Sequence, residues 1–189
     1  MERKISDKNV LERFAEEFCS VIEKHCRYLV CSGFVAIASG RTRGTEDIDM
    51  IIERLSEEKF ILLHNELVTA GFECVQSSDS KELYEYLVNN EGLRYVWAGR
   101  DLFPPEMEVH FSKDRLDDFQ LETRQKIEFV GVDIWFSSID MNIAFKEELL
   151  KSDKDIEDAN HLRRVYKDSI SEQNINKIKL MIQEFRMKK

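Results

Sequence analysis

The sequence predicts an α+β fold, close to the α/β class, in which helices flank a mixed β-sheet and a helical segment follows. Up to residue 137, short apolar stretches of strand length alternate with segments of helical periodicity. From residue 138 onward only the helical pattern continues. Glycine and proline, at 7 and 2 residues, are too few for a long linker or a disordered region. We therefore expect a core domain at residues 1–137 and a C-terminal helical segment at residues 138–189 that packs on it.

The first part of the core predicts a helix, a strand, a turn, a short helix and a second strand. Residues 8–26 repeat apolar side chains at helical spacing. The apolar run 28–31 has the length of a buried strand, and Ser32-Gly33 after it indicates a turn. Small and apolar residues then favour a short helix at 34–39. A second apolar run predicts a strand at 47–53.

The rest of the core alternates in the same way. Ser56 can cap a helix that ends at Gly71, because glycine is common just after a helix. Residues 106–111 alternate polar and apolar side chains, as a half-buried strand does. Gly131 separates two short apolar stretches and predicts a turn between strands. The other expected elements are strands at 72–75, 93–98, 126–129 and 132–136, helices at 81–88 and 113–123, and a loop at 99–105.

The C-terminal segment is expected to form helices at about 138–150, 153–167 and 171–187. Several basic residues gather there, and a solvated helix face explains them more simply than a nucleic-acid site does. The net charge of -9 also disfavours nucleic-acid binding over the whole surface. The basic residues are Arg163, Arg164, Lys167, Lys177, Lys179, Arg186, Lys188 and Lys189.

The sequence also predicts the cellular location of the protein and the state of its cysteines. No apolar run approaches the roughly 20 residues of a membrane span. The first residues lack the apolar stretch of a signal peptide, so we expect a cytoplasmic protein without a membrane partner. The four cysteines form no C-x-x-C pair, which disfavours a zinc site and favours reduced thiols.

Asp47 and Asp49 stand at the start of the strand predicted at 47–53. Side chains on a strand alternate faces, so the two carboxylates should point the same way, roughly 6–7 Å apart at the backbone. Neighbouring carboxylates repel each other unless a cation lies between them. Hard divalent ions such as magnesium take oxygen ligands of this kind. These residues therefore predict a metal site at a strand end, near a glycine turn that could approach a phosphate.

The motif Ser32-Gly33 followed by Arg43-x-Thr45-x-Asp47-Ile48-Asp49 resembles the nucleotidyltransferase-fold family of DNA polymerase beta. Within that superfamily it is most similar to a group of minimal proteins that includes the nucleotidyltransferase-like toxins of toxin–antitoxin systems. The resemblance implies a nucleotidyltransferase-like sheet, a nucleoside triphosphate such as ATP as substrate, and magnesium, with manganese as the alternative metal. It leaves a tRNA end, a protein hydroxyl and a small molecule open as acceptors.

The same resemblance assigns roles to individual residues. Asp47 and Asp49 would bind the metal and serve catalysis, and a third carboxylate is expected on a neighbouring strand. Glu108 is the chosen candidate, although the family often has aspartate there; Glu106 and His110 on the same face are weaker candidates. Taken alone, Glu108 would be a solvated acid. Ser32 and Gly33 would hold the β- and γ-phosphates, Arg43 would pair with phosphate oxygens unless it pairs with Glu46, and Thr45 would position the strand end.

The helical segment carries a second match. Phe145-Lys146, followed by the run from Lys154 to Asp158, resembles the family's pattern of a helical lysine and then K-D-x-x-D. Lys146 would reach the triphosphate across a cleft, or would otherwise be an ordinary exposed helical lysine. Asp158 would anchor its helix or orient a basic neighbour. Ser152 stands where relatives often carry arginine, which weakens the expectation of full catalytic competence.

We therefore predict a magnesium-dependent nucleotidyltransferase that moves a nucleoside monophosphate from a triphosphate to an acceptor that the residues do not specify. The alternative is a nucleotide-binding module with reduced catalysis, or a toxin–antitoxin interaction module, that has the same fold. The residues leave the base preference and the oligomeric state open as well.

Overall fold

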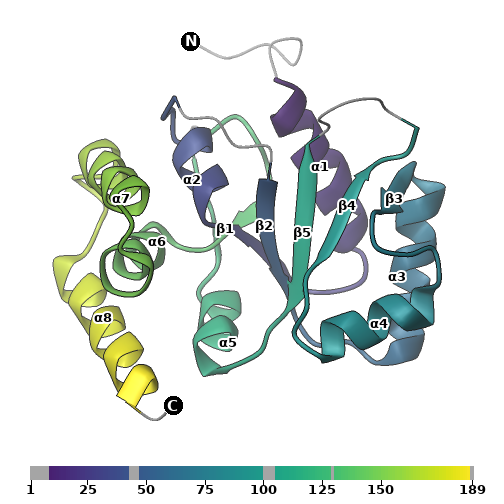
Figure 1. The fold of residues 1–189 in the computed structure, drawn as a ribbon. Coiled ribbons are helices and arrows are strands. Elements are labelled where there is room, and N and C mark those ends of the chain that lie inside the picture. The colour runs from purple at the N-terminus through teal and green to yellow at the C-terminus, as the bar shows by residue number, and fades with distance from the viewer. Residues whose placement is uncertain (1–8, 43–46, 100–104, 129, 188–189) are drawn as a thin grey trace.

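The computed structural model describes residues 9–42, 47–99, 105–128 and 130–187 (Figure 1). One sheet runs through the core, and helices lie around it and beyond one of its edges. The strands are β1 (Tyr28–Cys31), β2 (Asp47–Ile52), β3 (Phe72–Cys74), β4 (Leu93–Trp97), β5 (Glu106–Phe111), β6 (Gln125–Lys126) and β7 (Trp135–Phe136). The helices are α1 (Val10–Ile22), α2 (Gly33–Ala38), α3 (Glu57–Thr69), α4 (Ser80–Val88), α5 (Arg115–Glu122), α6 (Ile139–Phe145), α7 (Asp153–Val165) and α8 (Glu172–Met187), with a π-helix at Lys146–Leu150.

The sheet is mixed and has the strand order β3-β4-β5-β2-β1-β7-β6. At its centre β2 pairs antiparallel with β1 and parallel with β5. β4 pairs antiparallel with both β3 and β5, and β1 pairs parallel with β7. This topology places the predicted acidic strand, β2, directly beside the strand that carries Glu108. The predicted α+β class with a mixed sheet and C-terminal helices is confirmed.

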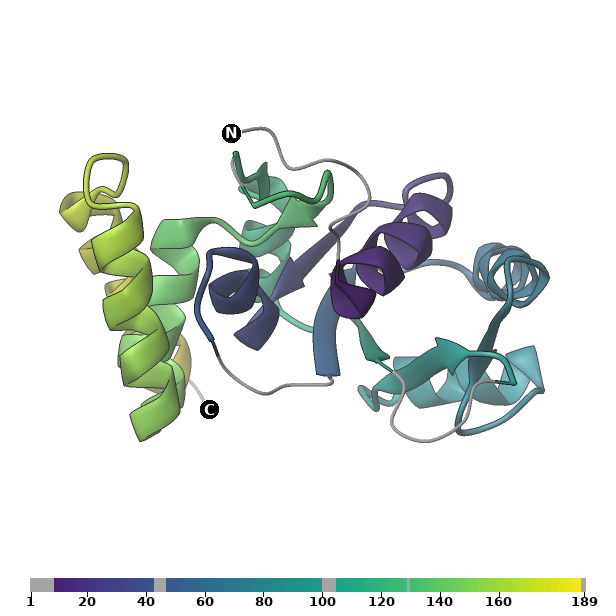
Figure 2. The ribbon, with the colours of Figure 1, turned by 90° about the horizontal axis from the view of Figure 1, so that it is seen from above.

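One face of the sheet is covered by α1, which lies behind the strands in Figure 1 and along one side of them in Figure 2. Asn9 caps α1: its side chain accepts a hydrogen bond from the Glu12 backbone N–H. The Glu12 side chain in turn accepts one from the Asn9 backbone N–H, which completes a capping box. The apolar stripe of α1 packs through Phe14, whose ring centroid lies 5.0 Å from that of Trp97 in an edge-to-face contact. Phe18 contacts Phe72 in the same way at 5.1 Å. The first predicted helix therefore supplies one wall of the core.

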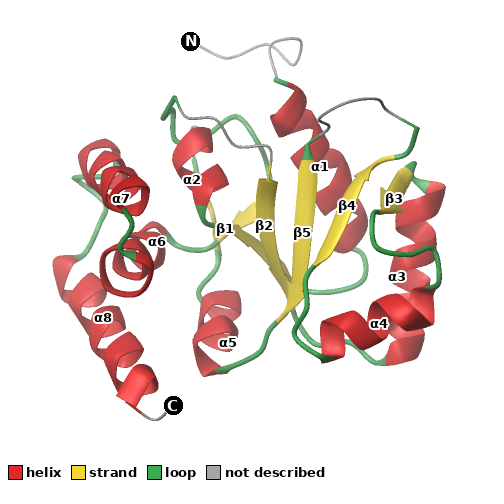
Figure 3. Cartoon of the chain, viewed as in Figure 1, coloured by secondary structure: helices red, strands yellow, loops and turns green. Residues whose placement is uncertain are grey.

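The C-terminal helices α6, α7 and α8 lie together, beyond α2 from the centre of the sheet (Figure 3). The apolar stripe of α8 is buried, with Ile175, Ile178 and Ile182 at most 1% exposed. Glu147 joins the helices through Arg163, with Nε to Oε1 at 2.6 Å, and through Lys179, with Nζ to Oε2 at 2.5 Å. The division of the chain into domains at residue 138 stays a prediction.

The predicted hairpin around Gly131 is only partly right. We expected strands at 126–129 and 132–136, whereas β6 and β7 have two residues each and pair antiparallel. The apolar residues between them do enter the core, but from irregular backbone: Ile127, Val130, Val132 and Ile134 are at most 8% exposed. Their apolar pattern reflects burial and not strand pairing. Among the described residues, no helix has both the length and the apolar character needed to cross a membrane.

Candidate functional site

The acidic side chains of β2 and β5 share one face of the sheet. The register places Asp49 opposite Glu108. Two residues earlier on each strand, Asp47 lies opposite Glu106. The intervening Ile48 is fully buried on the other face, as the alternation of a strand requires. Because paired strands lie about 4.8 Å apart, the structure brings Asp49 and Glu108 together as neighbours on adjacent strands.

Ser32 joins β1 to α2 directly beside this acidic face. Its backbone has φ 62° and ψ −131°, a region that residues other than glycine rarely adopt. Holding such a conformation costs on the order of 1–3 kcal/mol, which the surrounding structure must offset. The Ser32 hydroxyl is close enough to the Asp49 carboxylate to lower the pKa of that carboxyl as a hydrogen-bond donor. Gly33 follows as the first, buried residue of α2. Cys31, the residue before Ser32, pairs with Asp49 in the sheet, so the turn lies next to the first acidic strand.

The surroundings of Asp49 on this acidic face raise the pKa of its carboxyl. Its partial burial raises the pKa of its carboxyl above the usual 3.8, and the negative charges of Glu108 and Asp47 raise it further. The Ser32 hydrogen bond and the nearby His110 act in the opposite direction but do not cancel the rise. A carboxylate in this position would be stabilised by a cation beside it.

Glu108 contacts a histidine from its own strand. His110 Nε2 lies 2.9 Å from Glu108 Oε1. Gly92 permits this arrangement, because a Cβ on that residue would lie 2.5 Å from His110 Cε1 and 2.6 Å from Glu108 Oε1. Sequence reasoning named His110 only as a weaker candidate ligand and missed Gly92, since the contact between them depends on how β5 lies beside the turn before β4.

The donor set has the chemistry of a magnesium or manganese site, since carboxylate oxygens are the ligands that these ions prefer. The side chains are nonetheless not assembled around one point. Among the described residues, no group of three or more histidine, cysteine, aspartate or glutamate side chains is arranged to hold a metal ion. His110 contacts one of the two carboxylate oxygens of Glu108, the third candidate ligand.

Two predicted binding residues, Arg43 and Thr45, lie outside the described residues. Lys146 is described, and it lies elsewhere than the sequence suggested. It was expected to reach across an open cleft, or to be an ordinary exposed lysine; its side chain is 1% exposed. Its Nζ lies 2.9 Å from Asp158 Oδ2 and 3.4 Å from Asp155 Oδ1. The difference arises because α7 packs over the π-helix, a tertiary contact that spacing does not reveal.

Asp158 contacts two basic groups. Besides Lys146, it pairs with the guanidinium of Arg41, which follows α2 in the chain. Sequence reasoning missed Arg41; the available signal was only that a buried aspartate needs positive neighbours. Ser152 caps α7 and accepts a hydrogen bond from Asp155 N at 3.2 Å. Ser152, where the resemblance led us to expect an arginine, therefore has a structural role in starting the helix.

Comparison with known proteins places the fold. No protein-family model and no curated protein sequence matches the chain. A crystal structure of an antigenic nucleotidyltransferase-like protein from Paracoccidioides brasiliensis matches with a TM-score of 0.55 and 16% identity, covering 95% of this chain and 89% of that one. The solution structure of the antibiotic-resistance factor ANT(2'')-Ia matches at 0.52 and 12%, covering 93% and 92%.

A crystal structure of ANT(2'')-Ia in complex with adenylyl-2''-tobramycin also matches, with a TM-score of 0.51 and 13% identity, and covers 93% of this chain and 98% of that one. Each likeness extends over almost the whole of both chains, so it includes the C-terminal helices as well as the sheet. At these identities the matches show a shared nucleotidyltransferase-like fold and nothing finer.

Proposed function

We propose that this protein is a magnesium-dependent nucleotidyltransferase that moves a nucleoside monophosphate from a nucleoside triphosphate to an acceptor. The observation that carries the proposal is the pairing of Asp49 with Glu108 across β2 and β5. Asp47 lies on the same face, and the Ser32 hydroxyl contacts Asp49 at the adjoining turn. The nucleotidyltransferase-like fold, shared over most of the chain, agrees with this assignment.

In the proposed reaction an acceptor oxygen attacks the α-phosphorus, the bond from that phosphorus to the bridging oxygen breaks, and pyrophosphate leaves. Asp47, Asp49 and Glu108 would hold the divalent cation, and Glu108 has a second carboxylate oxygen besides the one that contacts His110. Bound magnesium would activate the attacking oxygen and neutralise charge on the leaving group. Most of the rate in such transfers comes from positioning and charge neutralisation, which rigid neighbouring strands can supply.

The turn at Ser32-Gly33 would contact the β- and γ-phosphates, and Arg43 and Thr45 would add a cation and position the strand end. Lys146 has a different proposed part from the one expected of it. Because its amine is buried between two aspartates, it would act on the site indirectly, through the elements that it holds together. Asp158 would share that part.

Nucleotide binding is the first test. Isothermal titration with ATP, GTP, CTP and UTP, each with and without magnesium, should show metal-dependent binding of at least one triphosphate. The variant Asp47→Ala/Asp49→Ala should lose that binding and keep its fold, as judged by circular dichroism. A charge-matched control, Glu85→Ala/Glu122→Ala, removes two exposed acids and should bind as the wild type does. A folded wild-type protein that binds no triphosphate with magnesium would contradict the proposal.

Transfer itself needs a triphosphate labelled at the α-phosphate. Incubation with fractionated RNA, protein and small molecules should label one fraction, and the double aspartate variant should not. Because ANT(2'')-Ia has been solved with adenylyl-2''-tobramycin, tobramycin is included among the small-molecule acceptors to be tested.

The second candidate is a nucleotide-binding module with reduced catalysis, which could also serve a toxin–antitoxin complex. The engagement of Glu108 by His110, and the lack of an assembled three-ligand group in the described part of the chain, favour it. Binding without any labelled product across the same fractions would select this candidate over the enzyme.

A further inference from the structure

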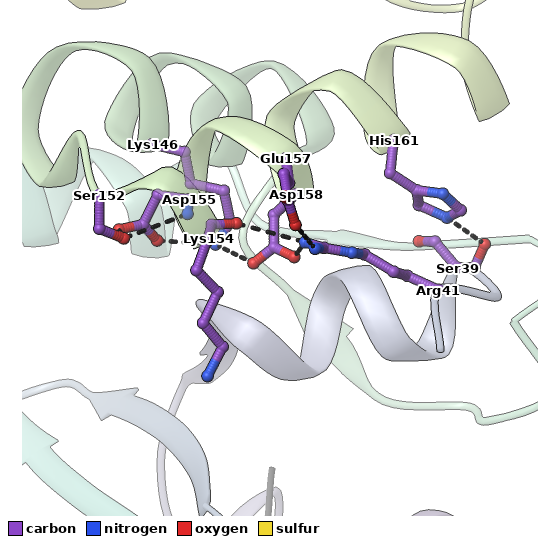
Figure 4. Close-up of polar contacts among 9 residues, drawn as sticks. All are labelled: Ser39, Arg41, Lys146, Ser152, Lys154, Asp155, Glu157, Asp158 and His161. Atoms are coloured by element: carbon purple, nitrogen blue, oxygen red, sulfur yellow. Dashed lines mark hydrogen bonds and ion pairs between the residues drawn. The ribbon is translucent and has the colours of Figure 1, made fainter. Parts of the chain in front are cut away.

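A network of charged side chains joins the end of α2 to α7 (Figure 4). Arg41 lies just after α2, and its guanidinium pairs with Asp158. The same group donates to Glu157 Oε2 at 2.5 Å and to the backbone oxygen of Lys154 at 3.2 Å. From the other side, Lys146 donates to Asp158 Oδ2 at 2.9 Å. Asp158 thus lies between two cations that come from distant parts of the chain.

The network is deeply buried at its centre. The Asp158 side chain is 0% exposed, that of Lys146 is 1% exposed and that of Arg41 is 16% exposed. Removing charges from water costs free energy that their mutual attraction often fails to exceed, so a buried ion pair is weak evidence of a role in stability alone. Fixing one arrangement over others is a better-attested use of such groups.

Two further contacts fix the same end of α2. His161 Nε2 lies 3.1 Å from the backbone oxygen of Ser39, and the Ser39 hydroxyl lies 3.0 Å from the Tyr166 hydroxyl. The six residues of α2 extend about 9 Å, so an anchor at the last turn also limits movement at the first. That first turn begins with Ser32 and Gly33, where the Ser32 hydroxyl meets Asp49.

We infer that Arg41 is a positioning residue: through Asp158 it holds α2 against α7 and so fixes the Ser32-Gly33 turn relative to Asp49. The inference rests on the proposed function for its link to nucleotide, but its structural part concerns the protein alone. Arg41 touches the network and not the acidic face. Loss of its guanidinium should loosen the turn and weaken triphosphate binding while the carboxylates of β2 and β5 stay in place.

The helix that carries Asp158, α7, also provides a matched control. Arg163 of α7 pairs with Glu147 and Glu172, which belong to the C-terminal helical elements. Its contacts therefore hold those elements to one another and not to α2. Arg41→Ala and Arg163→Ala each remove one partly buried arginine with two acidic partners, but only the first removes a contact between α7 and the end of α2.

The test measures two quantities on the full chain. Hydrogen exchange without nucleotide should be faster at the amides of residues 33–38 in Arg41→Ala than in the wild type, and unchanged there in Arg163→Ala. With magnesium and the triphosphate that the wild type binds, the dissociation constant of Arg41→Ala should rise roughly tenfold, within the usual range for coupled sites. Arg163→Ala should keep the wild-type constant even where its melting temperature falls.

Arg41→Lys provides a second variant if Arg41→Ala does not fold. It retains a cation beside Asp158 but lacks the planar fork, so exchange and affinity should lie between those of the wild type and Arg41→Ala. Unchanged exchange at residues 33–38 in the Arg41 variants would overturn the inference, as would an equal loss of affinity in Arg163→Ala. If the wild type binds no triphosphate, the proposed function fails, and with it the link of the network to nucleotide; the exchange result then shows separately whether Arg41 holds α2.

Discussion

On the acidic face of β2 and β5, Asp49 lies beside Glu108 and Asp47, and the sum of its surroundings raises the pKa of its carboxyl. At the junction of α2 and α7, Asp158 lies between Lys146 and Arg41. The first region gathers like charges at the edge of solvent, whereas the second buries charges of both signs in alternation. Neighbouring like charges favour a cation beside them, whereas balanced buried charges favour one fixed arrangement of the elements that carry them.

The largest effect is expected from removing a buried charge at the junction of α2 and α7. Asp158→Ala removes the buried carboxylate that lies 2.9 Å from the Lys146 amine and the buried partner of Arg41. Truncating one member of a buried pair costs roughly 3–5 kcal/mol, so urea unfolding should show a free energy of unfolding lower by about that amount.

Glu157→Ala is the control for this loss, because Glu157 pairs with the same arginine from a side chain that is 70% exposed. An exposed pair contributes about 0–1 kcal/mol, so this variant should stay close to the wild type. If Asp158→Ala were as mild as Glu157→Ala, the junction would not be the buried charge network that its contacts indicate.

The next effect concerns the backbone of Ser32 on the acidic side. Ser32→Ala removes the hydrogen bond to Asp49 and keeps the unfavourable positive φ, so it should lower the free energy of unfolding by about 1 kcal/mol. Ser32→Gly loses the same hydrogen bond but adopts that backbone freely. The glycine variant should therefore be more stable than the alanine variant by about 1–2 kcal/mol.

Ser39 at the other end of α2 provides the comparison, because its φ of −81° suits any residue. There alanine should be more stable than glycine, since glycine gives up more conformational freedom on folding. Equal stability of Ser32→Gly and Ser32→Ala in chemical unfolding would show that Ser32 is not strained.

These two regions also separate what the sequence could predict from what it could not. Alternation along a strand was enough to place Asp47 and Asp49 on one face, and helical periodicity located α1 and the C-terminal helices. Both patterns are local, so they follow from the chain alone. The pairing of β2 with β5 came from the resemblance and not from any residue, because strand order depends on the whole sheet.

The junction could not be predicted in the same way. Arg41 and Asp158 are 117 residues apart, and nothing in their neighbourhoods marks them as partners. Lys146 has the spacing of a helical lysine, and its burial follows only from the packing of α7 on the π-helix. The positive φ of Ser32 could not be predicted either, because a serine, unlike a glycine, does not indicate that conformation in a sequence.

A smaller effect is expected where the acidic face meets β4. Gly92→Ala puts a methyl group within 2.7 Å of His110 Nε2 and 2.6 Å of Glu108 Oε1, so those side-chain ends must move. Because they are flexible, the cost should be near the low end for overpacking, about 1 kcal/mol. In a His110→Ala background the same substitution should cost less, which thermal unfolding of the four proteins in the cycle would measure. Full additivity would mean that Gly92 and His110 do not share this space.

The smallest effect is a difference in pH dependence between the acidic face and the pair of Glu147 with Arg163 in the C-terminal helices, a second place where opposite charges meet. A hydrogen bond from Arg163 holds the pKa of Glu147 below its usual 4.5, so this group stabilises the fold at neutral pH. That contribution is lost as the pH falls through the lowered pKa. Asp49 has the opposite sign: its raised pKa disfavours the fold well above pH 3.8, and the penalty disappears on acidification.

Unfolding free energies measured between pH 6 and pH 3 should therefore move apart in two variants. Glu147→Gln should lose less stability than the wild type over this interval, by about 0.5–1 kcal/mol, because the group that is protonated has been removed. Asp49→Asn should lose more than the wild type, since it lacks the relief that protonation of Asp49 provides. Parallel curves of unfolding free energy against pH for the two variants would contradict this prediction. They would mean that the carboxylates on the acidic face and those of the C-terminal helices have similar electrostatic surroundings, so that the two regions differ in burial alone.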